Sequence, residues 1–182
     1  MPARAGTIAC SLLAALLLVA ASFGSAGCGE EDLQEVPEGL AFELGDLEYK
    51  ALFSRFLNIN DTEDRAYLQG QPPPPPGQLY LGVFLEVENI GDEVQSLPAL
   101  LTVIDTEETV YESIPFENDF TLELGGRLAS GEEAPELDSP AASGPIKGAM
   151  ILFLVEQSST ENRPLELEIP GEDESARIEL DI

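Results

Sequence analysis

Much of the chain alternates hydrophobic and polar side chains, which is the period-two pattern of strands with one buried face. In the clearest case, Leu79–Val87, Leu and Val residues alternate with Tyr80, Gly82, Phe84 and Glu86. Because some of these intervening side chains are also apolar, the strand is predicted to bury one whole face and part of the other. It should therefore be central in its sheet.

An almost unbroken apolar run at Ala149–Val155 predicts a second buried strand. Weaker alternation predicts the remaining strands, at Leu47–Phe53, Leu101–Ile104, Thr109–Ile114, Phe120–Leu124, Leu165–Ile169 and Ile178–Ile182. Asp105–Glu108 is predicted to be a hairpin turn, and Pro170–Asp173 the turn between the last two strands. The only predicted helix is a single turn near Asp61–Leu68.

Seven or eight short strands with regularly spaced turns predict an all-β fold, an immunoglobulin-like antiparallel β-sandwich over residues 47–182. The chain contains no Trp, so the buried Trp of antibody domains is not its hallmark. A domain of about 140 residues is expected to bury enough surface to be stable without a disulfide.

Residues 1–27 have the pattern of a secretory signal peptide. Arg4 and the α-amino group give a positive start, Ile8–Phe23 is apolar, and small residues from Ser25 to Gly27 precede Cys28. The apolar run is shorter than the roughly 18 residues that a spanning helix needs. Cleavage between Gly27 and Cys28 is therefore predicted in place of a permanent membrane helix.

The sequence around Cys28 resembles the lipobox of bacterial lipoproteins, with Ser25 where that motif usually has an aliphatic residue. By this resemblance, the Cys28 thiol would be acylated with diacylglycerol, and Cys28 would become the new N-terminus. The resemblance implies a lipid anchor on the outer face of the cytoplasmic membrane. Because Cys10 is removed with the signal peptide, the mature chain has one Cys and no intramolecular disulfide is expected.

Residues 28–46 are predicted to be the lipidated Cys and an acidic tether, since Glu30–Gly39 is rich in Glu and Asp and shows no periodicity. The whole chain has 35 acidic and 8 basic side chains, a formal net charge of −27. This charge predicts good solubility and repulsion from an anionic membrane surface. It also argues against nucleic acid as a partner, because phosphates would be repelled.

The side-chain inventory is poor in catalytic chemistry. The chain has no His, which removes Ser-His and Cys-His pairs and the commonest metal ligand. Ser143 precedes Lys147 by four residues, whereas a Ser-x-x-Lys pair requires three. Paired carboxylates act on glycosides, but no pair stands out among 35 acids. We therefore expect no enzyme and name no catalytic residue.

One loop carries the side chains of a hard-cation site. Calcium takes six to eight oxygen ligands, which makes Asn58, Asn60, Asp61, Glu63 and Asp64 candidate calcium ligands, the only cofactor that the sequence suggests. The loop lacks the Gly and the later Glu of the helix–loop–helix calcium motif. This difference favours the alternative, a solvated loop with Asx turns.

Five consecutive prolines, Pro72–Pro76, are predicted to adopt polyproline II. Such a run is a docking ligand for aromatic-lined grooves in some proteins. The interpretation that we favour is a rigid connector that fixes the approach to the central strand.

The order of segments resembles a known family. Tyr80–Asn89 and its following Gly-Asp turn, the hairpin through Val103–Thr106, and Leu128–Glu132 before the apolar Gly148–Val155 carry the resemblance. They resemble the immunoglobulin-like lipoprotein domain of unknown function found in many Gram-positive envelopes, over roughly residues 47–182. In that family the hairpin turn often has a Gly where Glu108 stands. The resemblance implies a fold and a location, and no catalytic residues.

The sequence thus predicts a membrane-anchored extracytoplasmic lipoprotein that presents a non-catalytic binding or interaction domain in the cell envelope. Its expected partners are the membrane, through the lipid, and an envelope protein. The alternatives are an accessory subunit of an envelope transporter or sensor and, third, an envelope hydrolase that works through carboxylates.

Overall fold

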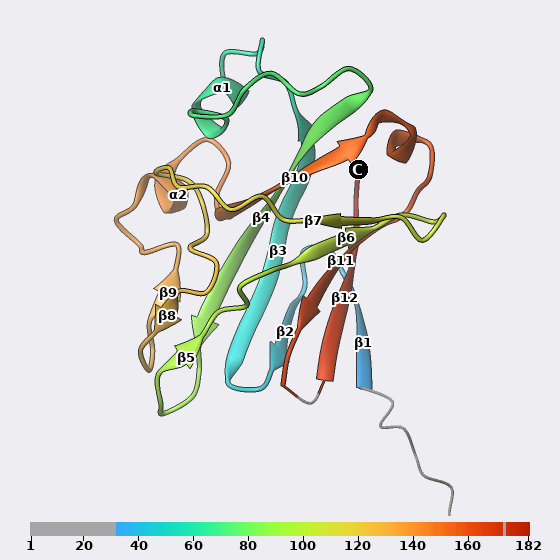
Figure 1. Ribbon diagram of the computed structural model, residues 1–182. Coiled ribbons are helices and arrows are strands. Elements are labelled where there is room, and N and C mark those ends of the chain that lie inside the picture. Colours follow the sequence, from blue (N-terminus) through green and yellow to red (C-terminus); the bar gives the residue numbers. More distant parts are fainter. Residues whose placement is uncertain (1–31, 173) are drawn as a thin grey trace, which may run out of the picture. The chain divides into compact units, whose positions relative to one another are not determined.

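The computed structural model of the protein describes residues 32–172 and 174–182 (Figure 1). The predicted signal peptide and Cys28 lie outside these residues. The described part contains twelve strands, of which seven have four or more residues. These seven are β1 (Asp32–Pro37), β2 (Ala41–Leu44), β3 (Leu47–Leu57), β4 (Gln78–Asn89), β10 (Ala149–Glu156), β11 (Leu165–Pro170) and β12 (Glu174–Leu180).

The remaining elements are short. The strands are β5 (Gln95–Ser96), β6 (Thr102–Ile104), β7 (Val110–Glu112), β8 (Arg127–Leu128) and β9 (Glu133–Ala134). The helical turns are α1 (Asp64–Tyr67), α2 (Pro140–Ser143) and the 3₁₀ turn η1 (Gln157–Thr160). In the described part, no helix has the length and hydrophobicity that crossing a membrane requires.

Two sheets form a β-sandwich, which confirms the predicted fold class. Sheet A has the order β1-β12-β11-β6-β7, and sheet B has the order β10-β4-β3-β2 with β9 paired to the end of β4. Neighbouring strands are antiparallel except β1 and β12, which are parallel. The prediction that the Leu79–Val87 strand is central is confirmed, because β4 lies between β10 and β3.

The inner faces of the two sheets form the main core. Its side chains are the alternating apolar residues of the long strands, including Leu81, Val83, Leu85, Ile151, Phe153, Leu167 and Ile178, all at most 2% exposed. Burial of one face of each strand is the main source of stability in a sandwich of this kind.

A second core lies on the opposite face of sheet B. Tyr80 and Phe84 of β4 pack there with Met150 and Leu152 of β10. The segment that includes α1 covers them through Tyr67, whose ring contacts Phe84 edge-on at 5.4 Å between centroids. Both faces of β4 and β10 are therefore buried along part of their length, which explains why these two strands read as nearly continuous apolar runs.

Tyr67 connects three of the segments that pack over the second core. Its hydroxyl accepts a hydrogen bond from the backbone N–H of Ile146 at 3.0 Å, and its carbonyl accepts one from Nδ2 of Asn118 at 2.8 Å. Its ring also lies 4.6 Å from that of Phe120. The loops around residues 67, 118 and 146 are thus fixed to one another over sheet B.

The tether prediction is wrong for residues 32–44, because Asp32–Pro37 and Ala41–Leu44 form β1 and β2. β1 is the outer strand of sheet A, and in β2 only Leu44 is fully buried. Both are edge strands that bury few apolar side chains, so their sequences show no row of apolar residues like that of the inner strands. The sandwich therefore includes residues 32–44, which precede the predicted start at residue 47.

The strand predicted at Phe120–Leu124 is also not formed. Only Thr121 makes a bridge there, a parallel one to Met150 of β10. The apolar side chains alternate because Leu122 enters the main core while Phe120 packs against the second core. A chain segment that crosses the end of a sandwich can alternate in this way without being part of a ladder.

The hairpin predicted around Asp105–Glu108 is confirmed, since β6 and β7 pair antiparallel across it. Glu108 has a φ of +63° and is the only non-glycine residue of the described part with positive φ. Left-handed backbone is strained for a residue with a Cβ. A Gly at this position would be free of that strain.

Glu108→Gly is expected to raise the free energy of unfolding by about 0.5 to 1 kcal/mol, since the relief of strain exceeds the added flexibility of the unfolded chain. The matched control is Glu107→Gly, an exposed neighbour without positive φ, which should lower stability slightly. Urea unfolding of both variants measures the difference. Equal effects at the two positions would contradict the strain at Glu108.

Candidate functional site

The longest irregular stretch of the described chain is residues 113–148, between β7 and β10. It contains only β8, β9 and α2, each of two to four residues. Long irregular segments on a rigid β scaffold are where binding sites concentrate. In Figure 1 this stretch, coloured yellow to orange, passes in front of β10 and β4 and continues to α2. It lines two neighbouring surface hollows.

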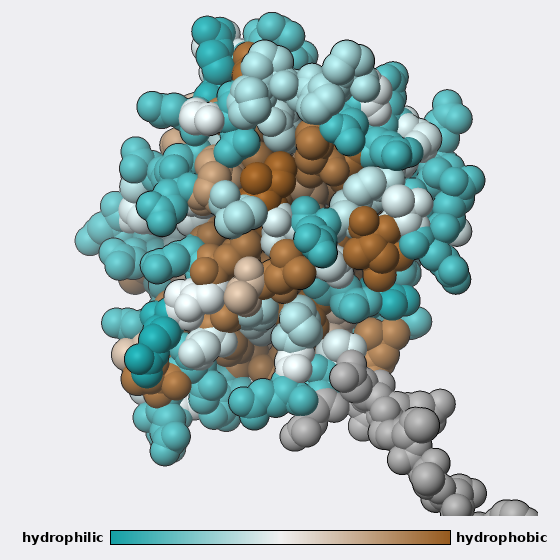
Figure 2. Space-filling view, in the orientation of Figure 1, coloured by the Kyte–Doolittle hydropathy of each residue, from teal (hydrophilic) through white to brown (hydrophobic). Residues whose placement is uncertain are grey.

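The first hollow has a volume of about 740 Å³ and follows the outer edge of β10. Its floor consists of the buried side chains of Leu122, Met150 and Leu152, and its walls include half-buried Ile114 and Phe116. The wall also carries Glu117 and Glu123. Figure 2 shows apolar side chains reaching the surface in the middle of this view, surrounded by hydrophilic ones.

A second hollow, of about 520 Å³, adjoins the first, because Thr121–Glu123 lines both. Its walls come from β8, β9 and the segments that follow them. Leu137, at 78% exposed, stands in this wall. We call the two hollows together the β10 groove. Each is within the size range of ligand pockets, about 300–1,000 Å³.

Negative charge dominates the β10 groove. Six of its lining residues are acidic and one, Arg127, is basic. The acidic ones are Glu117, Asp119, Glu123, Glu132, Glu133 and Glu136. A groove with an apolar floor and an acidic rim attracts cations and repels phosphates and carboxylates.

The backbone of the β10 edge is already engaged beside the groove. Met150 donates its N–H to the carbonyl of Phe120 and accepts from the N–H of Leu122, while the carbonyl of Leu152 accepts from Ile114. Because the covering segment takes these groups, recognition in the groove is expected to depend on side chains more than on addition of a strand.

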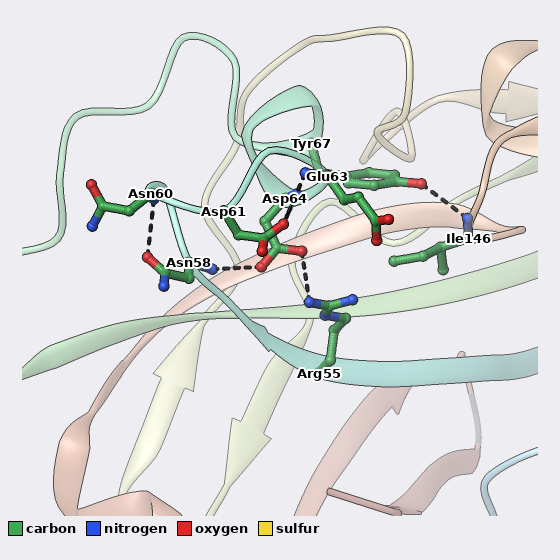
Figure 3. Close-up of polar contacts among 8 residues, drawn as sticks. All are labelled: Arg55, Asn58, Asn60, Asp61, Glu63, Asp64, Tyr67 and Ile146. Atoms are coloured by element: carbon green, nitrogen blue, oxygen red, sulfur yellow. Dashed lines mark hydrogen bonds and ion pairs between the residues drawn. The ribbon is translucent and has the colours of Figure 1, made fainter.

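The loop predicted to bind calcium has a different arrangement (Figure 3). Oδ1 of Asn58 accepts from the N–H of Asn60, and Oδ1 of Asp61 accepts from the N–H of Glu63. The carboxylate of Asp64 turns inward, where it accepts from the N–H of Asn58. These contacts confirm the interpretation of the loop as a set of Asx turns.

Asp64 is the residue that fixes this loop to the sandwich. Its side chain is 1% exposed and forms an ion pair of 2.8 Å with Arg55 of β3. Within residues 32–172 and 174–182, no three His, Cys, Asp or Glu side chains are placed to hold a metal ion. The geometry therefore gives the calcium hypothesis no support, and the loop oxygens serve backbone amides.

A buried polar cluster joins the β6–β7 hairpin to η1. The hydroxyls of Tyr111 and Ser159 are hydrogen bonded at 2.8 Å, and Oδ2 of Asp105 lies 3.4 Å and 3.5 Å from them. Ser159 is fully buried and Asp105 is 5% exposed. Because a substrate has no access to these atoms, the cluster has a structural role.

The surroundings of Asp105 lower the pKa of its carboxyl. Burial alone would raise the pKa of its carboxyl, but hydrogen bonds from the backbone N–H groups of Thr109 and Glu107 outweigh burial and lower the pKa. The carboxylate form is therefore favoured in the folded protein. In the unfolded chain the pKa returns to about 3.9.

Asp105 is expected to contribute an acid-sensitive part of the stability. Since the folded pKa lies below the unfolded one, this contribution is complete above about pH 5 and is lost as the pH falls through the folded pKa. The difference in unfolding free energy between wild type and Asp105→Asn should therefore shrink as the pH falls below about 4. Urea titrations of both proteins at several pH values measure it, and a difference independent of pH would contradict the prediction.

The proline run is exposed and held at both ends. Pro72, Pro73, Pro75 and Pro76 are exposed, and the run has no regular secondary structure. The hydroxyl of Tyr80 donates to the carbonyl of Pro72 at 2.9 Å. The segment connects α1 to β4, as expected for a rigid connector.

Comparisons with known proteins show the fold. No family model and no curated protein sequence matches this chain. An uncharacterised β-sandwich protein from Clostridium difficile superposes with a TM-score of 0.52 at 12% identity, covering 84% of this chain and 97% of that one. This similarity agrees with the sandwich described above.

Two further solved structures are from Bacillus subtilis. The yjhA protein has a TM-score of 0.48 at 14% identity, over 81% of this chain and 99% of its own. A candidate lipoprotein, ycdA, has a TM-score of 0.49 at 13% identity, over 79% of this chain and 38% of its own. The immunoglobulin-like lipoprotein family resembled by the sequence remains a prediction.

Sequence reasoning did not find the β10 groove. Its floor residues, Leu122, Met150 and Leu152, carry the pattern of ordinary core positions. The signal that was available is the length of the irregular stretch at residues 113–148, which a compact sandwich does not need.

Proposed function

We propose that the protein is an extracytoplasmic lipoprotein whose sandwich is a non-catalytic binding domain of the cell envelope, with the β10 groove as its binding site. The observation that carries the proposal is the groove itself, in which half-buried apolar side chains lie within an acidic rim, built by an irregular segment on a rigid sheet.

The lipid anchor rests on the sequence. A signal-peptide pattern ends just before Cys28, and only three residues lie between this Cys and Asp32, the first described residue of β1. The anchored form would keep the sandwich close to the outer face of the cytoplasmic membrane. A protein held there meets other envelope proteins at high effective concentration.

The anchor is tested by mass spectrometry of the protein extracted from membranes. The expected N-terminus is Cys28 carrying diacylglycerol, and Cys28→Ala should leave the protein without lipid. An intact N-terminal segment in the membrane-extracted protein would overturn the anchor.

The binding role is tested by photo-crosslinking in intact envelopes. The photoreactive residue p-benzoylphenylalanine replaces Phe116 in the groove wall or, as a matched control, Phe42 of β2, which is half-buried as well. A discrete adduct is expected from the Phe116 position and not from Phe42. Absence of any adduct at Phe116, or equal adducts at both positions, would contradict the groove as the binding site.

A further inference from the structure

We infer that the β10 groove binds an extended peptide segment with an apolar centre and flanking Lys or Arg residues. The inference rests on the proposed function in taking this groove as the binding site, and it adds the chemistry of the partner. Three properties of the groove lead to it, namely its shape, its floor and its charge.

The shape favours an extended occupant. The two hollows have volumes of about 740 Å³ and 520 Å³, and both are lined by Thr121–Glu123. A ligand that occupies both must extend over this segment, beyond the size of one typical small-molecule pocket. A peptide in extended conformation meets this requirement, since each residue advances by about 3.3 Å.

The partly exposed apolar side chains beside the floor determine the central residues of the peptide. Half-buried Ile114, Phe116 and Leu124 stand beside a floor of buried Leu122 and Leu152. Apolar side chains placed there lose water contact and gain about 25 cal/mol for each Å² of buried apolar surface. Because the β10 backbone is engaged with Phe120, Leu122 and Ile114, these side chains supply the affinity.

The negative charge of the groove determines which residues flank the apolar centre of the peptide. The described lining of the groove has six acidic residues and Arg127 as its one basic residue. None of the six carboxylates has an ion-pair partner within the described chain. A cationic segment would neutralise them, whereas an anionic lipid surface or a phosphate chain would be repelled.

Fluorescence anisotropy on the full chain in non-ionic detergent tests the inference. The probe is a labelled peptide with two Lys, then Leu-Phe-Leu, then two Lys. Replacing Leu-Phe-Leu by three Ser should weaken binding at least about tenfold, and replacing the Lys by Glu should abolish it. Binding of the Ser peptide with unchanged affinity would show a purely electrostatic attraction and would overturn the inference.

Paired charge reversals locate the site. Glu117→Lys with Glu123→Lys should weaken binding of the Leu-Phe-Leu probe at least about tenfold. Glu107→Lys with Glu179→Lys changes the net charge equally at exposed positions outside the groove lining. This control should retain the affinity within about threefold. Equal losses in the two variants would overturn the assignment to the groove.

The two proposals fail in distinguishable ways. If the Phe116 crosslinker captures a partner but the cationic probe does not bind at millimolar concentration, the partner chemistry is wrong and the binding role stands. If the probe binds in the groove but no adduct forms in envelopes, the peptide chemistry stands and the envelope role fails.

Discussion

Phe84→Ala is expected to lower the free energy of unfolding by about 3 to 5 kcal/mol, the largest effect predicted for this protein. Phe84 is fully buried in the second core, on the face of sheet B away from sheet A. Its loss leaves a cavity beneath Tyr67 that neighbouring side chains cannot fill without moving the cover. Urea or thermal unfolding measures the change.

The control for Phe84 is Phe53→Ala. The ring of Phe53 lies 6.4 Å from that of Phe84 between centroids, but Phe53 is 42% exposed. Phe53→Ala should therefore lower the free energy of unfolding much less, by about 1 kcal/mol. Limited trypsin digestion gives a second measurement, because Arg65 lies in α1, which covers this core. Cleavage at Arg65 should accelerate in Phe84→Ala, and equal stability of both variants would mean that the second core is not formed.

Asn89→Ala is expected to lower the free energy of unfolding by about 3 kcal/mol, a fall in Tm of about 10 °C. The side chain is fully buried at the end of β4. Its Nδ2 donates to the carbonyls of Glu93 and Leu128 at 2.7 and 2.8 Å, and its Oδ1 accepts from the N–H of Gly91 at 3.0 Å. Alanine leaves all three backbone groups without this partner, and the contact with the Leu128 carbonyl is buried.

Asn60→Ala is the matched control, since this Asn is exposed and its side chain forms no hydrogen bond in the described structure. Its removal should change stability by no more than about 0.5 kcal/mol. Asn89→Asp separates hydrogen bonding from shape, because it keeps the volume but places a carboxylate oxygen against two carbonyls. We expect Asn89→Asp to be at least as unstable as Asn89→Ala near pH 7, and wild-type stability of either variant would refute the bridging role.

The sequence predicted the inner strands well because burial on a pleated sheet imposes a period of two. β3, β4, β10 and β11 lie where alternation or an apolar run placed them, whereas β12 begins four residues before the strand predicted at Ile178–Ile182. The edge strands β1 and β2 were missed for a physical reason, since they bury few apolar side chains: Leu33 of β1 is 42% exposed, and in β2 only Leu44 is fully buried.

The groove was not predictable from local pattern. Its walls bring together residues around 115, 122, 135 and 151, and no local sequence signal reports such distant contacts. For the loop at residues 58–64, composition left a cation site and a set of Asx turns open and favoured the turns, and the side chains of Asn58, Asp61 and Asp64 accept from backbone amides. The composition of a loop shows which possible ligand atoms it contains, whereas the packing of the folded chain determines where those side chains point.

The parallel pairing of β1 with β12 has a mechanical consequence. β1 pairs with β12 from Asp32 to Pro37, beginning at the strand end nearest to Cys28 in sequence. If a membrane lipid holds Cys28 while a partner pulls on the sandwich, the tension enters β1 along its length. The hydrogen bonds between β1 and β12 are then loaded together in shear and do not open one by one, which makes this edge of the sheet the stress-bearing junction between membrane and domain.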